Sequence, residues 1–187
     1  TGKWYCVNPY FYPMRIYPLS EGSFSIDSTK VFVPFEGDIQ NRPPGSILVQ
    51  VQPFVVVTEN DIILLDTGLG YFNNQGILQI HANLMAIGID PSSVTKVFLS
   101  HLHKDHSGGI SYLHPQHQER FISFPYATYY IQKSEYDLAL QSKSASYISE
   151  QIQILEAFSK VQWLTQEEGV IEDLIHYKIT GGHSLYH

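Results

Sequence analysis

Residues 100–109, SHLHKDHSGG, constrain this chain more than any other stretch. They follow a short apolar run that predicts a buried strand. Because side chains alternate along an extended segment, His101 and His103 should point to the same side. Asp105 and His106 follow, where two glycines predict a turn. The stretch thus gathers three of the nine histidines and one carboxylate. Imidazole nitrogen and carboxylate oxygen are ligand types that bind zinc, iron or manganese, and this spacing argues against a polar loop with unrelated histidines.

Two further motifs follow predicted strands. Residues 66–70 read DTGLG. A carboxylate at the end of a strand, followed by a glycine such as Gly68, can lie close under a metal site and hold a ligand or a turn by hydrogen bonds. Asp66 could also be a ligand itself. Near the other end, residues 180–187 read TGGHSLYH and place His183 directly behind two glycines.

Together these motifs resemble those of the metallo-β-lactamase superfamily. The resemblance implies an α+β fold, a four-layer αββα sandwich with a metal site at one edge of its paired sheets. It implies five metal ligands: His101, His103, Asp105, His106 and His183. The three histidines at 101, 103 and 183 would bind a first metal, and the remaining pair a second. Asp66 and Gly68 would then support the site rather than ligate.

The chemistry that this resemblance implies is hydrolysis by a metal-bound hydroxide, with the metals polarising the bond that is cut. Asp105 is the catalytic candidate, because a carboxylate beside the metal can pass a proton to the leaving group. The implied cofactor is Zn²⁺, two ions per complete domain, with iron or manganese as alternatives.

Within the superfamily, residues 84–109 and 131–136 resemble most the lactonase-like branch, and acyl-homoserine lactonases in particular. This favours a small ester, lactone or related carbonyl compound as the substrate. Lys104 stands where that branch often has an aromatic or small residue. It either binds an anionic substrate or product or is simply solvated. A glyoxalase II-type thioester hydrolase and a non-catalytic binding domain that retains the fold are the alternatives.

The family pattern continues with a bridging aspartate and a last histidine, which cannot be placed in these 187 residues. We therefore expect residues 1–187 to form a single domain of this fold. Its N-terminal and central parts would be present, and the sandwich would be incomplete at the C-terminus.

The composition limits which classes of molecule and which compartment this chain is suited to. A hydrophobic fraction of 43% suffices for a core, and a net charge of −7 without a basic stripe argues against nucleic acid. No apolar run reaches the roughly 18 residues needed to cross a membrane. The single Cys6 rules out an internal disulfide and fits a reducing, cytoplasmic compartment. The aromatic N-terminal arm, which includes Trp4 and Tyr12, predicts edge packing, a pocket wall or a homodimer contact.

Local patterns predict several elements whose positions bear on the site. They indicate a strand within 23–36, helices over 75–87, 133–140 and 146–159, and a short helix over 107–113.

Overall fold

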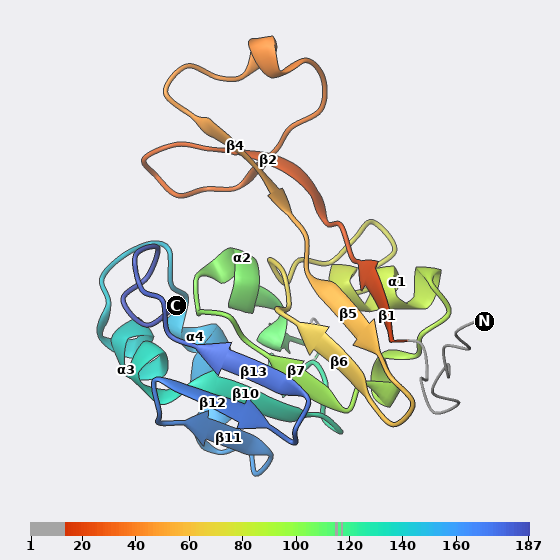
Figure 1. Ribbon diagram of the computed structural model, residues 1–187. Helices are drawn as coiled ribbons and strands as arrows, with labels where there is room; N and C mark the ends of the chain where they lie inside the picture. Colours follow the sequence, from red (N-terminus) through yellow and green to blue (C-terminus); the bar gives the residue numbers. More distant parts are fainter. Residues whose placement is uncertain (1–13, 115, 117) are drawn as a thin grey trace, which may run out of the picture.

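The computed structural model describes residues 14–114, 116 and 118–187. A six-stranded sheet lies at the centre of these residues (Figure 1). Its strands, in spatial order, are β1 (Arg15–Pro18), β5 (Phe54–Val57), β6 (Ile62–Leu65), β7 (Lys96–Phe98), β10 (Thr128–Gln132) and β11 (Val161–Leu164). β5 is antiparallel to both of its neighbours, β1 and β6, whereas β6, β7, β10 and β11 run parallel.

The parallel strands explain why residues far apart in the sequence meet. Leu65 at the end of β6 pairs with Phe98 at the end of β7, and Phe98 pairs with Tyr130 of β10. The segments that follow these three strands therefore leave the sheet side by side. They carry the first motif, the metal motif and helix α3.

Helices cover one face of the sheet, and they are α1 (Gln79–Ala86), α3 (Lys133–Gln141) and α4 (Ser149–Ile152), the last continued by a 3-10 turn over Gln153–Glu156. Val97 and Tyr129, paired across β7 and β10, are buried in the core that includes Leu84 of α1 and Ile152 of α4. Burial of such side chains is the main favourable contribution to folding.

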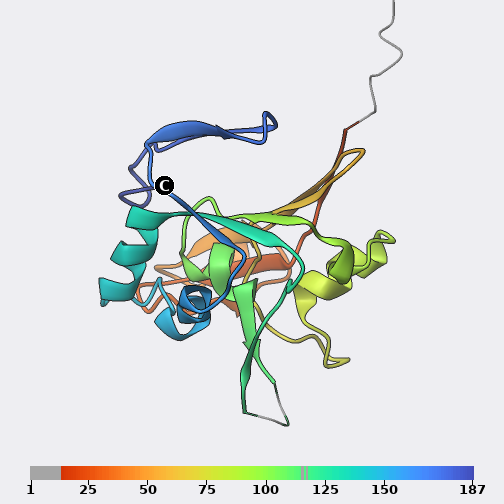
Figure 2. The ribbon, with the colours of Figure 1, turned by 90° about the horizontal axis from the view of Figure 1, so that it is seen from below.

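A hairpin of β12 (Glu168–Ile171) and β13 (Ile175–Lys178) lies on the opposite face (Figure 2). Lys96 and Tyr130 alternate with the core residues of their strands and face this hairpin. In its turn, Glu172 forms an ion pair with Lys96 at 3.0 Å and accepts a hydrogen bond from Tyr130 Oη at 2.9 Å. Helices, main sheet and second sheet are stacked in that order, which confirms the layered α+β fold class predicted from the sequence.

Residues 22–51 form a lobe that projects from the sheet (Figure 1). It contains β2 (Gly22–Ile26), β3 (Val33–Pro34) and β4 (Ile47–Val51), with β2 in the middle, and a 3-10 turn over Ile39–Asn41. The prediction of one strand within 23–36 is wrong. Asp27 accepts a hydrogen bond from the Thr29 N–H at 2.9 Å, and Lys30 adopts a φ of 60°, so the chain reverses.

The predicted helix over 107–113 is also wrong in its second half. Helix α2 spans Lys104–Ser107, a 3-10 turn follows over Gly108–Ile110, and the chain then enters β8 (Ser111–Leu113). β8 pairs with β9 (Arg120–Ile122), and this pairing overrides the local pattern.

Two predicted helices are shorter than expected: α1 (Gln79–Ala86) against 75–87, and α4 (Ser149–Ile152) with its 3-10 turn over Gln153–Glu156 against 146–159. The side chain of Asn73 accepts hydrogen bonds from the N–H groups of Gln75 and Ile77, which delays the start of α1.

None of the helices in the described ranges has the length and apolar character needed to cross a bilayer. The aromatic arm up to residue 13, with its predicted homodimer contact, lies outside the described residues.

Candidate metal centre

Three histidines meet beyond the carboxyl ends of the parallel strands. Nitrogen atoms of His101, His103 and His183 all lie within 4.8 Å of one another. Nδ1 of His103 is 3.1 Å from Nε2 of His183, across 80 residues of chain. The structure therefore brings together the three residues that the family resemblance assigns to a first metal.

The state of His101 fits metal binding. This side chain is 2% exposed, and its Nδ1 lies 3.1 Å from Ser100 Oγ, whereas its buried Nε2 has no hydrogen-bond partner among the described residues. A buried polar atom left in this way requires an explanation, and a metal ion supplies one. Burial, together with the charges of His106 and His103, lowers the pKa of His101 to about 2. The ring is thus neutral, which is the form that binds metals.

Asp66 lies beneath the cluster and fixes it by hydrogen bonds. Its Oδ1 accepts from the Ser100 N–H at 2.8 Å, and its Oδ2 accepts from Ser100 Oγ at 2.9 Å. Oδ2 is also 2.8 Å from Nδ1 of His106. A carboxylate on Nδ1 leaves Nε2 free to bind a metal, so these contacts are those of a supporting residue.

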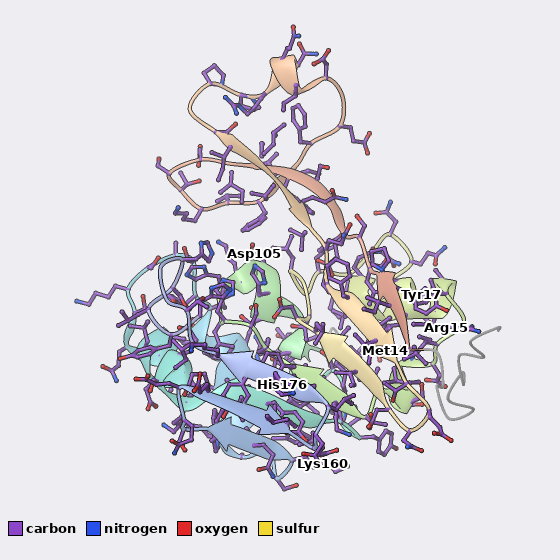
Figure 3. The ribbon with its side chains drawn as sticks, viewed as in Figure 1. Met14, Arg15, Tyr17, Asp105, Lys160 and His176 are labelled. Atoms are coloured by element: carbon purple, nitrogen blue, oxygen red, sulfur yellow. The ribbon has the colours of Figure 1, made fainter. Side chains whose placement is uncertain are left out.

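Asp105 and His106 lie beside the three histidines. The rings of His101 and His106 are 4.1 Å apart, and His106 Nε2 is 3.5 Å from Asp105 Oδ2. Burial lowers the pKa of His106, but the hydrogen bond and negative charge of Asp66 outweigh burial and raise it overall. Figure 3 shows Asp105 on α2, at the end that faces the lobe. The structure thus places all five predicted ligands in one region, and their roles as ligands stay predictions.

Close backbone packing joins the first motif to the metal motif. The N–H and hydroxyl of Thr67 both donate to the His106 carbonyl, at 2.7 and 3.0 Å. A Cβ atom added to Gly70, which has a φ of +73°, would lie 2.1 Å from the Gly108 carbonyl oxygen. Gly68 has a φ of +71°, and an added Cβ there would lie 2.3 Å from a carboxylate oxygen of Glu21. Only glycine permits these approaches.

Glu135 was not among the predicted site residues, yet it is 1% exposed and lies in the first turn of α3. Its Oε1 accepts from the Leu102 N–H at 3.1 Å and from the Tyr147 hydroxyl at 3.3 Å, and its Oε2 accepts from Ser184 Oγ at 2.9 Å. Leu102 separates two of the histidines and Ser184 follows the third. This carboxylate therefore connects both halves of the cluster. Its position directly after a strand is the one signal that the sequence carries.

Comparison with known proteins identifies the family. Residues 47–187 match the metallo-beta-lactamase superfamily. The chain belongs to this superfamily. A segment of 58 residues, 31% of this chain and 18% of the relative, is 41% identical to N-acyl homoserine lactonase AttM of Azorhizobium caulinodans.

Solved structures of similar fold agree with this assignment. A probable metal-dependent hydrolase from Staphylococcus aureus superposes with a TM-score of 0.70 at 18% identity, over 93% of this chain and 66% of that chain. AidC, a dizinc quorum-quenching lactonase, superposes with a TM-score of 0.66 at 22% identity, over 94% of this chain and 66% of that chain. The chain thus spans just under two thirds of the length of these structures, and the likeness confirms the metallo-β-lactamase fold.

This metallo-β-lactamase chain has a cavity of about 940 Å³ between α2, the first motif and the lobe, and its lining residue on α2 is Lys104, next to His103 in the sequence. Its lining includes Phe32 of the lobe, Leu69 of the first motif and Ile148 before α4. Lys104 also lines it, and its Nζ lies 5.7 Å from the centroid of the Phe32 ring. Glu21 lines the inner wall and is 7% exposed. The cavity has the size of a site for a small organic molecule.

Proposed function

We propose that this protein is a metal-dependent hydrolase of small esters or lactones. The observation that carries the proposal is the histidine cluster, in which a buried Nε2 of His101 has no partner among the described residues. Similarity to a relative named as an N-acyl homoserine lactonase and to AidC, a dizinc lactonase, supports a lactone as the first substrate to test.

In this proposal, His101, His103 and His183 hold a first divalent metal, and Asp105 with His106 holds a second, zinc at both sites. Such metals supply Lewis acidity toward a carbonyl oxygen and lower the pKa of a bound water molecule. Neutral imidazoles favour zinc, and two sites fit the five nitrogen and oxygen donors that the fold gathers.

The chain's own residues have three further tasks. Asp66 holds Nδ1 of His106, so that this ring keeps one orientation and one tautomer. Asp105, whose carboxylate lies 3.5 Å from Nε2 of His106, passes a proton to the leaving-group oxygen. The apolar wall formed by Phe32 and Ile148 binds the hydrocarbon part of the substrate and excludes water.

Replacement of His103 by alanine tests the proposal. Metal content per chain and hydrolysis of an N-acyl homoserine lactone, an aryl ester and a thioester would be measured on the same preparations. His103→Ala should lose metal from the three-histidine site and lower kcat/KM by at least about 100-fold. His176→Ala is the matched control, because His176 is exposed on β13, away from the cluster (Figure 3).

Full activity in metal-depleted His103→Ala would show that hydrolysis does not depend on this cluster. Metal binding by the wild-type protein without turnover of any of the three substrates would instead indicate a binding domain. A preference for the thioester over the lactone and ester would favour the glyoxalase II-type alternative.

A further inference from the structure

The side chain of Lys104 is placed in a way that folding alone does not explain. Its backbone N–H donates to the Ser146 carbonyl at 2.8 Å, which fixes the residue at the start of α2. Its half-buried side chain enters the cavity and lies over the ring of Phe32. Within the described ranges, no carboxylate lies at ion-pair distance from its ammonium group, whereas the buried Lys96 has two. Partial burial of an ammonium group costs free energy when no carboxylate pairs with it, and a ligand that carries a carboxylate would offset this cost.

The charged groups around Lys104 determine what it can bind. Lys30, on the lobe, lies close enough that its charge acts on Lys104. Asp105 attracts Lys104, but its carboxylate is turned toward the histidines. Two carboxyls also line the cavity: Glu21, which is buried against the Leu69 N–H, and Glu36, which is exposed on the lobe. Among the described residues that line the cavity, Lys104 is thus the one basic side chain, and its ammonium group can attract a small anion.

Apolar side chains form much of the remaining lining, so the ligand should also carry a hydrocarbon part. These side chains include Phe24, Val31, Phe32, Phe35, Leu69 and Ile148. Aromatic and aliphatic side chains bind a hydrocarbon chain, and a single cation among them selects the charge of that chain. Phe32 contributes to both, because its ring also stabilises the ammonium group of Lys104 by a cation–π contact.

We propose that the substrate is an anionic ester or lactone, with an apolar chain that fills this cavity and a carboxylate held by Lys104. This inference rests on the proposed function and names its substrate class. Lys104 is thus a specificity-determining residue, whereas the histidines and Asp105 carry out the reaction on neutral and anionic substrates alike.

Two esters of equal chain length test the preference. 4-Nitrophenyl valerate is neutral, and mono-4-nitrophenyl glutarate has the same five-carbon acyl chain with a terminal carboxylate. In the zinc-loaded protein, kcat/KM should be higher for the glutarate. Lys104→Met should lower the glutarate-to-valerate ratio by about tenfold, and Lys104→Arg should retain most of it. Lys160→Met is the control, because Lys160 lies far from α2 (Figure 3).

A binding measurement separates this inference from the proposed function. Calorimetric titration measures the affinity of the protein for octanesulfonate and for octanol. The two compounds have chains of equal length, but octanesulfonate is an anion that binds metals weakly and octanol is neutral. Lys104→Met should weaken the binding of octanesulfonate about tenfold and leave the binding of octanol unchanged. Equal ratios and equal affinities in wild type and Lys104→Met would overturn the inference while leaving hydrolysis intact. Selective sulfonate binding without hydrolysis of either ester would instead overturn the proposed function and leave the anion site standing.

Discussion

Glu21 is a buried acid at the point where the lobe meets the first motif. It is 7% exposed, its Oε2 accepts from the Leu69 N–H at 2.8 Å, and its Oε1 has no partner among the described residues. Burial raises the pKa of this carboxyl to about 7, and the Leu69 hydrogen bond only partly opposes the effect. Replacement by glutamine, which keeps the shape and the acceptor for Leu69, removes the ionisation without emptying the site.

The sign and size of the effect follow from proton linkage. Between an ordinary pKa of 4.5 and the folded value of about 7, the unfolded chain ionises while the folded chain retains its proton. The free energy of unfolding therefore falls as pH rises through this window, by about 1.4 kcal/mol per pH unit. The full loss is about 3 kcal/mol, present above pH 7 and absent below pH 4.5. Glu21→Gln should not show it.

Urea unfolding of wild type and Glu21→Gln at pH 5 and pH 8, with a chelator present, measures this contribution. All other titrating groups are common to both proteins, so they cancel in the difference. From pH 5 to pH 8 the stability of Glu21→Gln relative to wild type should rise by about 2–3 kcal/mol. Glu36→Gln, which alters an exposed carboxyl on the same lobe, should show no such change. A Glu21→Gln difference that is equal at both pH values would refute the reasoning.

Two further predictions concern packing around the cluster. Gly70 and Gly76 both have a φ of +73°, but an added Cβ at Gly76 meets nothing within 4 Å. Replacement by alanine should thus lower the free energy of unfolding by about 1–2 kcal/mol at both positions through backbone strain, and by about 1–3 kcal/mol more at Gly70 through the close contact. Thermal or urea unfolding measures these losses, and equal losses at the two positions would contradict the packing argument. Glu135→Ala should weaken zinc binding by about 10–100-fold in a chelator competition, whereas Glu135→Gln should retain most of the affinity, because the Ser184 hydroxyl can accept from the amide. Unchanged affinity in Glu135→Ala would show that the carboxylate does not position the histidines.

Short-range pattern accounts for much of the site. Asp66 and His101 each come just after an apolar run, and the ends of parallel neighbours lie together at one sheet edge. Strand assignment and motif spacing therefore predict that these residues meet. His183 is different, because 80 residues separate it from His103. Only the resemblance to a known family placed it in the same cluster.

Other parts of the site depend on tertiary contacts that no local pattern encodes. Glu135 stands in an ordinary amphipathic helix start, and Glu21 in an irregular segment before a glycine, so neither position signals burial. What makes each important is the set of distant N–H and hydroxyl groups that it accepts from. The same limit explains the lobe, where the reversal at Lys30 and the pairing of β2 with β4 replaced the single strand predicted over 23–36.

Chemistry and substrate choice are therefore encoded in different ways. The first motif supplies Leu69 to the cavity and is fixed against the metal motif, because Thr67 donates to the His106 carbonyl and Gly70 packs on Gly108. The opposite wall comes from the lobe, whose aromatic residues lie outside every motif. Lys104 is the exception, since it lies within the metal motif yet its side chain enters the cavity. In the proposed hydrolysis the flanking residues His103 and Asp105 take part and the lysine does not, which leaves this position free to select the charge of the substrate.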